Sequence, residues 1–509
     1  MMGTGGQRTY QSDANRYPDF GFAPADPLFA ALLIIAHMAY QKNWPTLLAY
    51  VAAVVVFLVA AAYAVVYATG YRLDLKTWTL KETGVLAITT KPSGATVVLN
   101  DIPQARKTPF TLRNALPGAY HIKLTLDGYL PYEKDLEVRS NQATEEHNVD
   151  LVLSDRQPMS VAENVNAILH VGDELWAWTG DKQFVKVGNP NTPLELDKLP
   201  TNVATILTQA TGLYLAKKHD NGNHIALGVM VGSKRWLVVM EPGGYRGQSF
   251  GAPLNQVTTE NLFWIDADRL MAFIGGSLYA IDMNLNQTRL YTRSITGVTY
   301  ANGKVYYIAR DKQSQLTLYR DNNLFDDRPA EAIFSNVPVA SHHEIMLTPD
   351  EAIMLLADNR STKGLWLAEP DPTDRSLPHH LTKLASSVHG TLYDYLNEQL
   401  LFVQNRTVSA YDVVLKTTRE LRRFTDTPQL IGKRNESVFL ATAGKFWTAD
   451  PDLSNLYELA SSARSTLLLG PDSRRVWLFA NGTLNELTLR VANQGVFGVL
   501  PDWLGRING

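Results

Sequence analysis

The chain contains one long apolar stretch, followed by a much longer region in which apolar and polar residues alternate. Residues 46–69 read TLLAYVAAVVVFLVAAAYAVVYAT, without a charged residue, an amide, a glycine or a proline. As a helix this stretch would be about 36 Å long, enough to cross a hydrocarbon core of about 30 Å. Trp44 before it and Tyr67 and Tyr71 at its far end are aromatic residues that favour the membrane interface. The pattern predicts a transmembrane helix over 46–69 that contacts the lipid bilayer, the alternative being a buried helix of a soluble protein.

Residues 1–45 precede this helix and show little periodicity. Asp26-Pro27 resembles the start of a helix, and the apolar segment 28–40 that follows is too short to span a bilayer. It either lies at the membrane surface, packs beside the main helix, or forms a second membrane pass. The apolar run begins too late and continues too long for a cleaved secretory signal, so we expect an uncleaved anchor.

The charges beside the helix do not determine its orientation. Loops on the cytoplasmic side of a membrane helix usually carry more Lys and Arg, so an excess on one side would indicate the orientation. Here three basic residues precede the span and three follow it: Arg8, Arg16 and Lys42, then Arg72, Lys76 and Lys81. The orientation therefore has to be inferred from the segments that follow.

Residues 84–153 have the pattern of a small β-sandwich. Residues 85–90 and 96–99 are rich in β-forming residues and are separated by a turn with Pro92 and Gly94. Farther along, the apolar residues Tyr120, Ile122, Leu124 and Leu126 alternate with polar ones, which is the period of a strand with one buried face. We expect an antiparallel sandwich over 84–153.

This segment resembles a PEGA domain. The resemblance is carried by KPSGATVVLND and by TPFTLRNALPGAYHIKLTLDGYLPYEKDLEV, with Ser93 at the position of the family's namesake glutamate. PEGA domains occur in bacterial and archaeal envelope proteins, often beside a membrane helix. The resemblance therefore implies that the β domains lie outside the cytoplasm, and it implies no catalytic residues.

From about residue 160 to residue 490 a short unit repeats. Each unit has an apolar strand, a polar turn and a stronger strand that often holds an aromatic residue, as in 175–178, 305–308 and 476–479. The units recur at roughly 35–50 residues, an interval typical of propeller blades. We predict a β-propeller over 160–499, with eight blades favoured, seven as the alternative, and a pair of β-sandwiches as the rival architecture. The repeats resemble the WD40-like or TolB-like class at the level of fold.

A propeller must also close its ring, and commonly the first and last blades share strands so that no strand edge is left unpaired. We therefore predict that the segment 159–170 lies beside the segment 484–499, close to the PEGA-like domain.

Composition excludes several kinds of chemistry. The chain has 509 residues and no cysteine, which excludes thiolate zinc sites, iron–sulfur clusters, disulfides and a catalytic thiol. The formal net charge of −3 gives no basic field for nucleic acid, so we expect no nucleic-acid partner. No G-x-S-x-G, Walker loop or H-E-x-x-H motif occurs.

Four groups of residues have a composition that could form a site. We interpret His342-His343-Glu344 and His379-His380 as exposed loop residues, because neighbouring strand residues point to opposite faces and cannot chelate one metal. The run Asp450 to Asn455 begins like a calcium loop but lacks its glycine and glutamate, so we interpret it as a turn. We interpret Asp321, Asp326 and Asp327 as a solvated acidic loop. We therefore assign no catalytic, cofactor-binding or metal-binding residue and expect no cofactor.

These patterns together predict a mostly β protein with one membrane pass. We expect a single-pass, membrane-anchored, extracytoplasmic binding or scaffolding protein of the cell envelope, and not an enzyme. The alternative is an envelope hydrolase with its active site at the propeller. The ligand, an envelope protein or a glycan, is not identified by the sequence.

Overall fold

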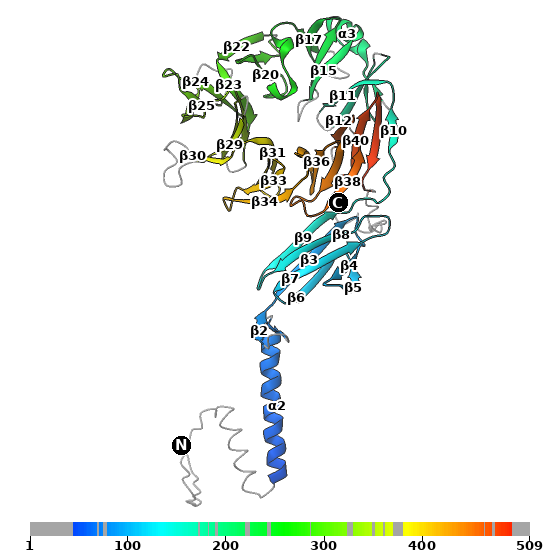
Figure 1. Ribbon diagram of the computed structural model, residues 1–509, viewed down its shortest axis with the longest axis vertical. Coiled ribbons are helices and arrows are strands. Elements are labelled where there is room, and N and C mark those ends of the chain that lie inside the picture. Colours follow the sequence, from blue (N-terminus) through cyan, green and yellow to red (C-terminus); the bar gives the residue numbers. More distant parts are fainter. Residues whose placement is uncertain are drawn as a thin grey trace, which may run out of the picture. The chain divides into compact units, whose positions relative to one another are not determined.

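The computed structural model (Figure 1) describes residues 44–68, 71–74 and 79–490, with gaps at 172–173, 182, 189–191, 219–223, 242–245, 286, 323–328, 349–351, 360–361, 370–379, 463 and 471–473. The tail 1–43, the segment 28–40 and the predicted ring segment 491–499 therefore lie outside the described residues. The structure is mostly β, with one long apolar helix, as the sequence predicts.

The apolar stretch forms helix α2 (Trp44–Ala68). Its most apolar window has a mean hydropathy of 2.6, and none of that window is buried within the protein. Among the described helices it alone is long and apolar enough to cross a membrane, which suits a membrane anchor or a signal sequence. A two-stranded hairpin, β1 (Tyr71–Asp74) and β2 (Thr79–Glu82), follows it. The guanidinium of Arg72 lies 3.6 Å from the ring centre of Tyr67 and donates to the Tyr67 carbonyl.

The next seven strands form two facing sheets, in the orders β5-β4-β7-β8 and β6-β3-β9. In β3 the predicted alternation is seen directly, because Leu86 and Ile88 are fully buried while their neighbours are not. The hydroxyl of Thr108 accepts hydrogen bonds from the backbone N–H groups of Gly94 and Ala95, which fixes the Pro92–Gly94 turn. The strands are β3 (Gly84–Lys91), β4 (Thr96–Leu99), β5 (Ile102–Lys107), β6 (Phe110–Ala115), β7 (Gly118–Thr125), β8 (Tyr132–Val138) and β9 (Ala143–Asp150).

From Met159 onward the described residues form eight four-stranded antiparallel sheets, which follow one another around a ring (Figure 1). This is a β-propeller. The number of blades in the whole protein, for which the sequence favours eight over seven, stays a prediction.

We name the sheets A to H and list the strands of each in their order of pairing, so that β10, the earliest of these strands in the chain, is the fourth strand of sheet H. Sheet A holds β11 (Val165–Val171), β12 (Glu174–Thr179), β13 (Phe184–Lys186) and β14 (Thr192–Pro193); sheet B holds β15 (Gly212–Lys218), β16 (Ile225–Val231), β17 (Lys234–Met240) and β18 (Gly247–Phe250); sheet C holds β19 (Leu262–Trp264), β20 (Arg269–Ile274), β21 (Ser277–Asp282) and β22 (Gln287–Arg293); sheet D holds β23 (Ile295–Ala301), β24 (Lys304–Arg310), β25 (Leu316–Asp321) and β26 (Glu331–Ser335). Sheet E holds β27 (His342–Leu347), β28 (Ile353–Asn359), β29 (Thr362–Glu369) and β30 (His380–Ala385); sheet F holds β31 (Val388–Asp394), β32 (Gln399–Gln404), β33 (Thr407–Asp412) and β34 (Thr417–Arg423); sheet G holds β35 (Gln429–Arg434), β36 (Ser437–Thr442), β37 (Lys445–Ala449) and β38 (Leu456–Ser461); sheet H holds β39 (Thr466–Leu469), β40 (Arg475–Ala480), β41 (Thr483–Thr488) and β10 (Met159–Ala162).

Burial falls from the second strand of a sheet to its outermost strand. In β20 the four central residues are buried, so the strand reads as a continuous apolar run, whereas most of β22 is exposed. The core lies between neighbouring sheets. One cluster, for example, joins Leu215 and Leu237 of sheet B to Leu262 and Leu270 of sheet C.

The ring closes where the sequence predicts. β10 pairs antiparallel with β41, with Met159 opposite Glu486 and Ser160 opposite Asn485. Ala162 and Leu484 share a buried cluster with Leu175 of sheet A. The closure prediction is thus confirmed for these described residues.

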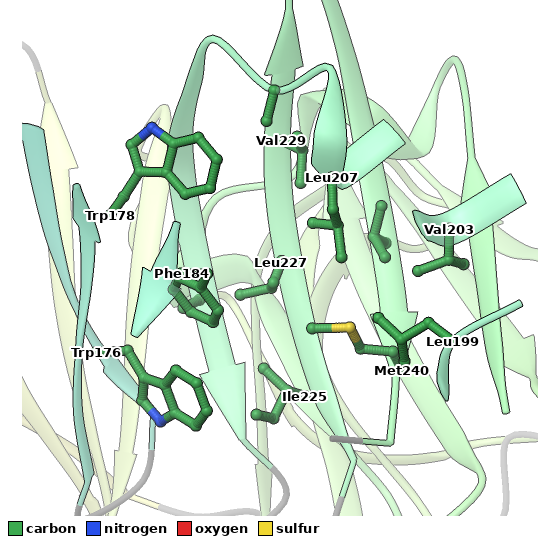
Figure 2. Close-up of a cluster of buried hydrophobic side chains, with 13 residues drawn as sticks. Trp176, Trp178, Phe184, Leu199, Val203, Leu207, Ile225, Leu227, Val229 and Met240 are labelled. Atoms are coloured by element: carbon green, nitrogen blue, oxygen red, sulfur yellow. The ribbon is translucent and has the colours of Figure 1, made fainter. Parts of the chain in front are cut away.

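A helix inserted between sheets A and B was not predicted. Helix α3 (Thr201–Thr208) buries Val203 and Leu207 against sheet B, in a cluster with Trp176 and Phe184 of sheet A (Figure 2). Gly247 lets β18 approach this helix, because a Cβ there would stand 3.2 Å from a Val203 methyl group. Three short 3-10 turns are also present: Leu196–Lys198, Leu254–Gln256 and Thr259–Asn261.

Candidate functional site

The propeller has a cleft of about 390 Å³ between sheets B and C. It is lined by Pro200, His224, Arg246, Gly247, Gln248, Asp268, Met283 and Asn284. His224 directly precedes β16 and Arg246 directly precedes β18, so both come from the turns of sheet B. Asp268 precedes β20 and Met283 follows β21 in sheet C. In each sheet, these turns connect the first strand to the second and the third strand to the fourth, so they all lie on the same side of the ring. We call that side the hairpin side.

Local hydrogen bonds hold the walls of the cleft together. The amide nitrogen of Gln248 donates to the Met283 carbonyl at 3.0 Å and so bridges the two sheets. The Met283 N–H in turn donates to the Asp268 carbonyl at 2.8 Å. The side-chain oxygen of Gln248 is buried and has no hydrogen-bond donor among the described residues.

A second feature of the hairpin side is a pair of turns in sheet F that expose large apolar side chains. Tyr395, Leu396, Val414 and Leu415 are each between 65% and 70% exposed. The two turns are neighbours, because the Val413 N–H donates to the Glu398 carbonyl at 3.1 Å. We call these four residues the apolar turn pair.

Aspartates at the strand ends order both turns. Asp394 accepts from the Leu396 N–H at 3.1 Å, and Asp412 accepts from the Leu415 N–H at 2.8 Å. The ammonium of Lys433 in sheet G pairs with Asp394, and both side chains are buried. The apolar turn pair is therefore held in place by polar contacts and by the neighbouring sheet.

The PEGA-like sheets contact the propeller through a buried ion pair. Asp150, at the end of β9, lies 2.8 Å from the guanidinium of Arg490, which follows β41. Arg490 also donates to the Leu151 carbonyl at 3.2 Å and to the Ser437 hydroxyl at 2.8 Å. The Leu153 N–H donates to the Leu489 carbonyl at 2.9 Å, so the backbones of the two segments are joined as well.

A second ionic cluster lies in the same joint. The ammonium of Lys134 in β8 lies 3.1 Å from Asp452 in sheet G and 3.0 Å from Glu146 in β9. Asn455 accepts from the Glu133 N–H at 3.2 Å, and the Tyr457 hydroxyl donates to the Pro131 carbonyl at 2.9 Å. All the propeller residues in this cluster lie in or beside the turn between β37 and β38, on the hairpin side.

Burial shifts the acid–base behaviour of this cluster. It raises the pKa of Asp450 to about 6, with the nearby Asp452 carboxylate adding to the shift and Asn455, Lys134 and Ser454 opposing it. Burial alone would also raise the pKa of Asp452, but Lys134 and the Ser454 hydrogen bonds lower it overall. Burial would lower the pKa of Lys134, yet Glu146 and Asp452 together raise it.

The run Asp450 to Asn455 is a turn, as the sequence indicates, and its oxygens have protein partners. Asp450 accepts from the Ser454 hydroxyl at 3.0 Å and from the Asn455 amide at 2.8 Å, while Asp452 faces the lysine ammonium. In a calcium loop, oxygens at such positions would bind the cation. Here they accept hydrogen bonds from, or pair with, other groups of this chain.

Two interpretations of candidate residues were wrong. His342 and His343 belong to strand β27, not to a loop, and His343 is buried. Its ring nitrogens lie 2.8 Å from the Thr296 hydroxyl and 2.8 Å from the Pro338 carbonyl, and burial lowers its pKa. Asp321 lies at the end of β25 and is buried, accepting from the Tyr291 hydroxyl. His379, Asp326 and Asp327 lie outside the described residues.

Neither the cleft nor the apolar turn pair was predicted from the sequence. A signal was present, because sheets C and F repeat one pattern at the end of their third strand: AIDMNL at 280–285 and AYDVVL at 410–415. The aspartate fixes the turn in both copies, since Leu285 N–H donates to Asp282 at 2.9 Å as Leu415 N–H does to Asp412. The leucine three residues later is exposed in both copies.

Comparison with known proteins agrees with this architecture. The family model of the PEGA domain matches residues 83–156, so this part of the chain is a PEGA domain. The chain as a whole therefore combines an apolar N-terminal helix, a PEGA domain and a β-propeller. No curated protein sequence matches it.

Solved structures with a similar fold include three proteins of low sequence identity. The tricorn protease is 11% identical, with a TM-score of 0.38, over 71% of this chain and 39% of that one. Sqt1 from Saccharomyces cerevisiae is 11% identical, with a TM-score of 0.43, over 66% of this chain and 98% of that one. BamB from Moraxella catarrhalis is 12% identical, with a TM-score of 0.42, over 67% of this chain and 98% of that one. This chain spans about two fifths of the length of the tricorn protease.

Proposed function

We propose that this chain is a single-pass, membrane-anchored binding protein of the cell envelope that presents its propeller outside the cytoplasm. Helix α2 would be the anchor, and the PEGA domain would connect it to the propeller. Envelope proteins are where PEGA domains occur, which supports the extracytoplasmic placement.

The observation that carries this proposal is the joint at Arg490. One guanidinium, directly after β41, links the end of β9 in the PEGA domain to the propeller, at a place where the ring is closed by β10. A binding platform gains affinity when its surfaces are already ordered, because little conformational freedom is lost on binding. A closed ring coupled to its neighbouring domain is such a platform.

A protein partner fits the exposed surface best. Large exposed apolar side chains gathered at one place mark contact sites, and the apolar turn pair adjoins sheet G, which already carries the contacts to the PEGA domain. We therefore propose that the turn pair extends this interface to an envelope protein, with lipid or glycan binding as the competing outcomes of the test.

The rival function is an envelope hydrolase. The described lining of the cleft contains His224 and Asp268 but no serine, threonine, cysteine or lysine that could act as a nucleophile. No group of three metal-ligating side chains is found in the described part of the chain. These observations support binding over catalysis.

Protease added to intact cells tests the placement. We expect removal of the PEGA domain and propeller, leaving a short fragment that contains α2. Protection of the propeller until the cells are lysed would overturn the proposed orientation.

The binding role is tested by purifying the full chain in detergent and identifying proteins recovered in equal amounts with it. The purified partner should then rebind in a two-component assay. Turnover of envelope polymers by the purified chain, with no such partner, would favour the hydrolase.

A further inference from the structure

The cleft between sheets B and C holds charged groups of both signs that have no partner among the described residues. Among the residues that the structure describes, the side chains of His224, Arg246, Asp268 and Asn284 make no hydrogen bond or ion pair. Arg246 and Asp268 therefore face the same cleft without pairing with each other. We propose that this cleft is a binding site for a short peptide or peptide-like zwitterion, with a carboxylate at Arg246 and an ammonium group at Asp268.

A neighbouring aspartate on the same turn, unlike Asp268, has a partner among the described residues. In the turn before β20, Asp266 accepts from the backbone and side chain of Arg269, at 2.9 and 2.7 Å. That pair leaves Asp268, two residues farther on, as the carboxylate that faces the cleft. The turn is thus fixed by one aspartate while the other stays available.

The lining of the cleft is partly apolar and adjoins packed parts of the fold. His224 is 9% exposed, and its ring lies 6.1 Å from that of Trp264. The cleft residue Pro200 precedes α3, and His224 precedes β16, both of which contribute to the packed cluster of Figure 2. A preformed site of this kind requires little reorganisation when a ligand binds.

The chemistry of the lining selects the ligand class. A guanidinium offers donors that match a carboxylate in two-point geometry, and a carboxylate accepts only from donors such as ammonium. The buried oxygen of Gln248 lacks a donor, and a peptide N–H would supply one. A neutral sugar would leave both Arg246 and Asp268 without an opposite charge. The volume of about 390 Å³ is at the small end for ligand sites and fits about two or three residues.

Calorimetry with the full chain in detergent tests the proposal, with trialanine as the probe. Trialanine should bind, whereas N-acetyl-trialanine and trialanine amide should each bind about tenfold more weakly or worse, because each loses one charge-assisted contact. Arg246→Gln should abolish the preference for the free carboxylate, and Asp268→Asn the preference for the free amine. Arg293→Gln and Asp181→Asn, exposed charges outside the cleft, should change nothing.

Several results would overturn the proposal: no binding of trialanine at ten millimolar, equal binding of the free and blocked peptides, or unchanged preferences in the two cleft variants. Circular dichroism of each variant separates loss of binding from loss of folding. The test does not depend on the proposed protein partner, because the peptide is added to the purified chain alone.

Discussion

The guanidinium of Arg490 and the carboxylate of Asp150 lie 2.8 Å apart, and their side chains are 2% and 5% exposed. Asp150 is the last residue of β9 in the PEGA domain, and Arg490 follows β41 of the propeller. A buried pair of this kind costs desolvation energy when it forms, and it becomes strongly unfavourable when one partner is removed.

Replacing Arg490 should therefore destabilise the joint. We expect Arg490→Ala to lower the free energy of unfolding by about 3–5 kcal/mol, since Asp150 would stay buried without its counter-ion. Urea unfolding of the full chain in detergent measures this change. Arg475→Ala is the matched control, because Arg475 is 47% exposed in its pair with Glu486 at 3.5 Å, and its loss should cost less than about 1 kcal/mol. If both variants lower the free energy of unfolding equally, burial of the Arg490–Asp150 pair does not increase the cost of removing its arginine.

Closure of the ring makes a prediction about truncation. A chain that ends after Asn481 lacks β41, so both β40 and β10 lose a neighbouring strand. We expect the whole propeller to melt at a lower temperature in one transition, and not only its last sheet. A chain that ends after Arg490 keeps β41 and is the control. If the shorter chain melts at the temperature of the longer one, the pairing of β10 with β41 does not stabilise the propeller.

The raised pKa of Asp450 makes a prediction about pH. The folded chain holds this proton up to about pH 6, whereas the unfolded chain releases it near about pH 4. Between these values the folded state binds more protons, so this group's contribution to stability falls as pH rises, by at most about 3 kcal/mol.

Asp450→Asn should remove that decline. We would measure urea unfolding of both proteins from pH 4 to pH 7 and compare their difference at each pH. Asp452 acts in the opposite sense at lower pH, because its lowered pKa adds stability that is lost on acidification below that range. A difference that stays constant across the series would contradict the assignment.

The apolar turn pair makes a prediction about partner binding. Leu396→Ser combined with Leu415→Ser should leave stability within about 0.5 kcal/mol, because both side chains are largely exposed. The same double variant should reduce recovery of the protein partner. Val339→Ser removes an equally exposed residue from the opposite side of the ring and should not. Full recovery by the double variant would place the binding surface elsewhere.

The parts of the fold that depend on local pattern could be predicted from the sequence. The alternation in β3 follows from one buried face, and the length of α2 follows from an apolar run without breaks. Helix α3 was missed although Leu199, Val203 and Leu207 recur every four residues, because so short an element resembles the strand segments on either side of it.

The joint and the cleft could not be predicted in this way. Asp150 and Arg490 are far apart in the sequence, and no local pattern indicates that they meet. Lys134 likewise approaches Asp452 only because β8 packs against the turn after β37. The Asp450 turn has the composition of a cation loop, and it takes the folded chain to show that its carboxylates face donors of the protein.

The pairing of β10 with β41 also bears on how the protein is made. Met159 emerges from the ribosome early, and its partner Glu486 emerges only near the end of synthesis. At about 5–20 residues per second, the first strand waits for roughly tens of seconds. During that time its unpaired edge is open to wrong pairing with other chains. If the chain is exported while it is still being synthesised, this edge needs protection until β41 arrives. Either a chaperone binds the strand, or the earlier sheets are stable while the ring is still open.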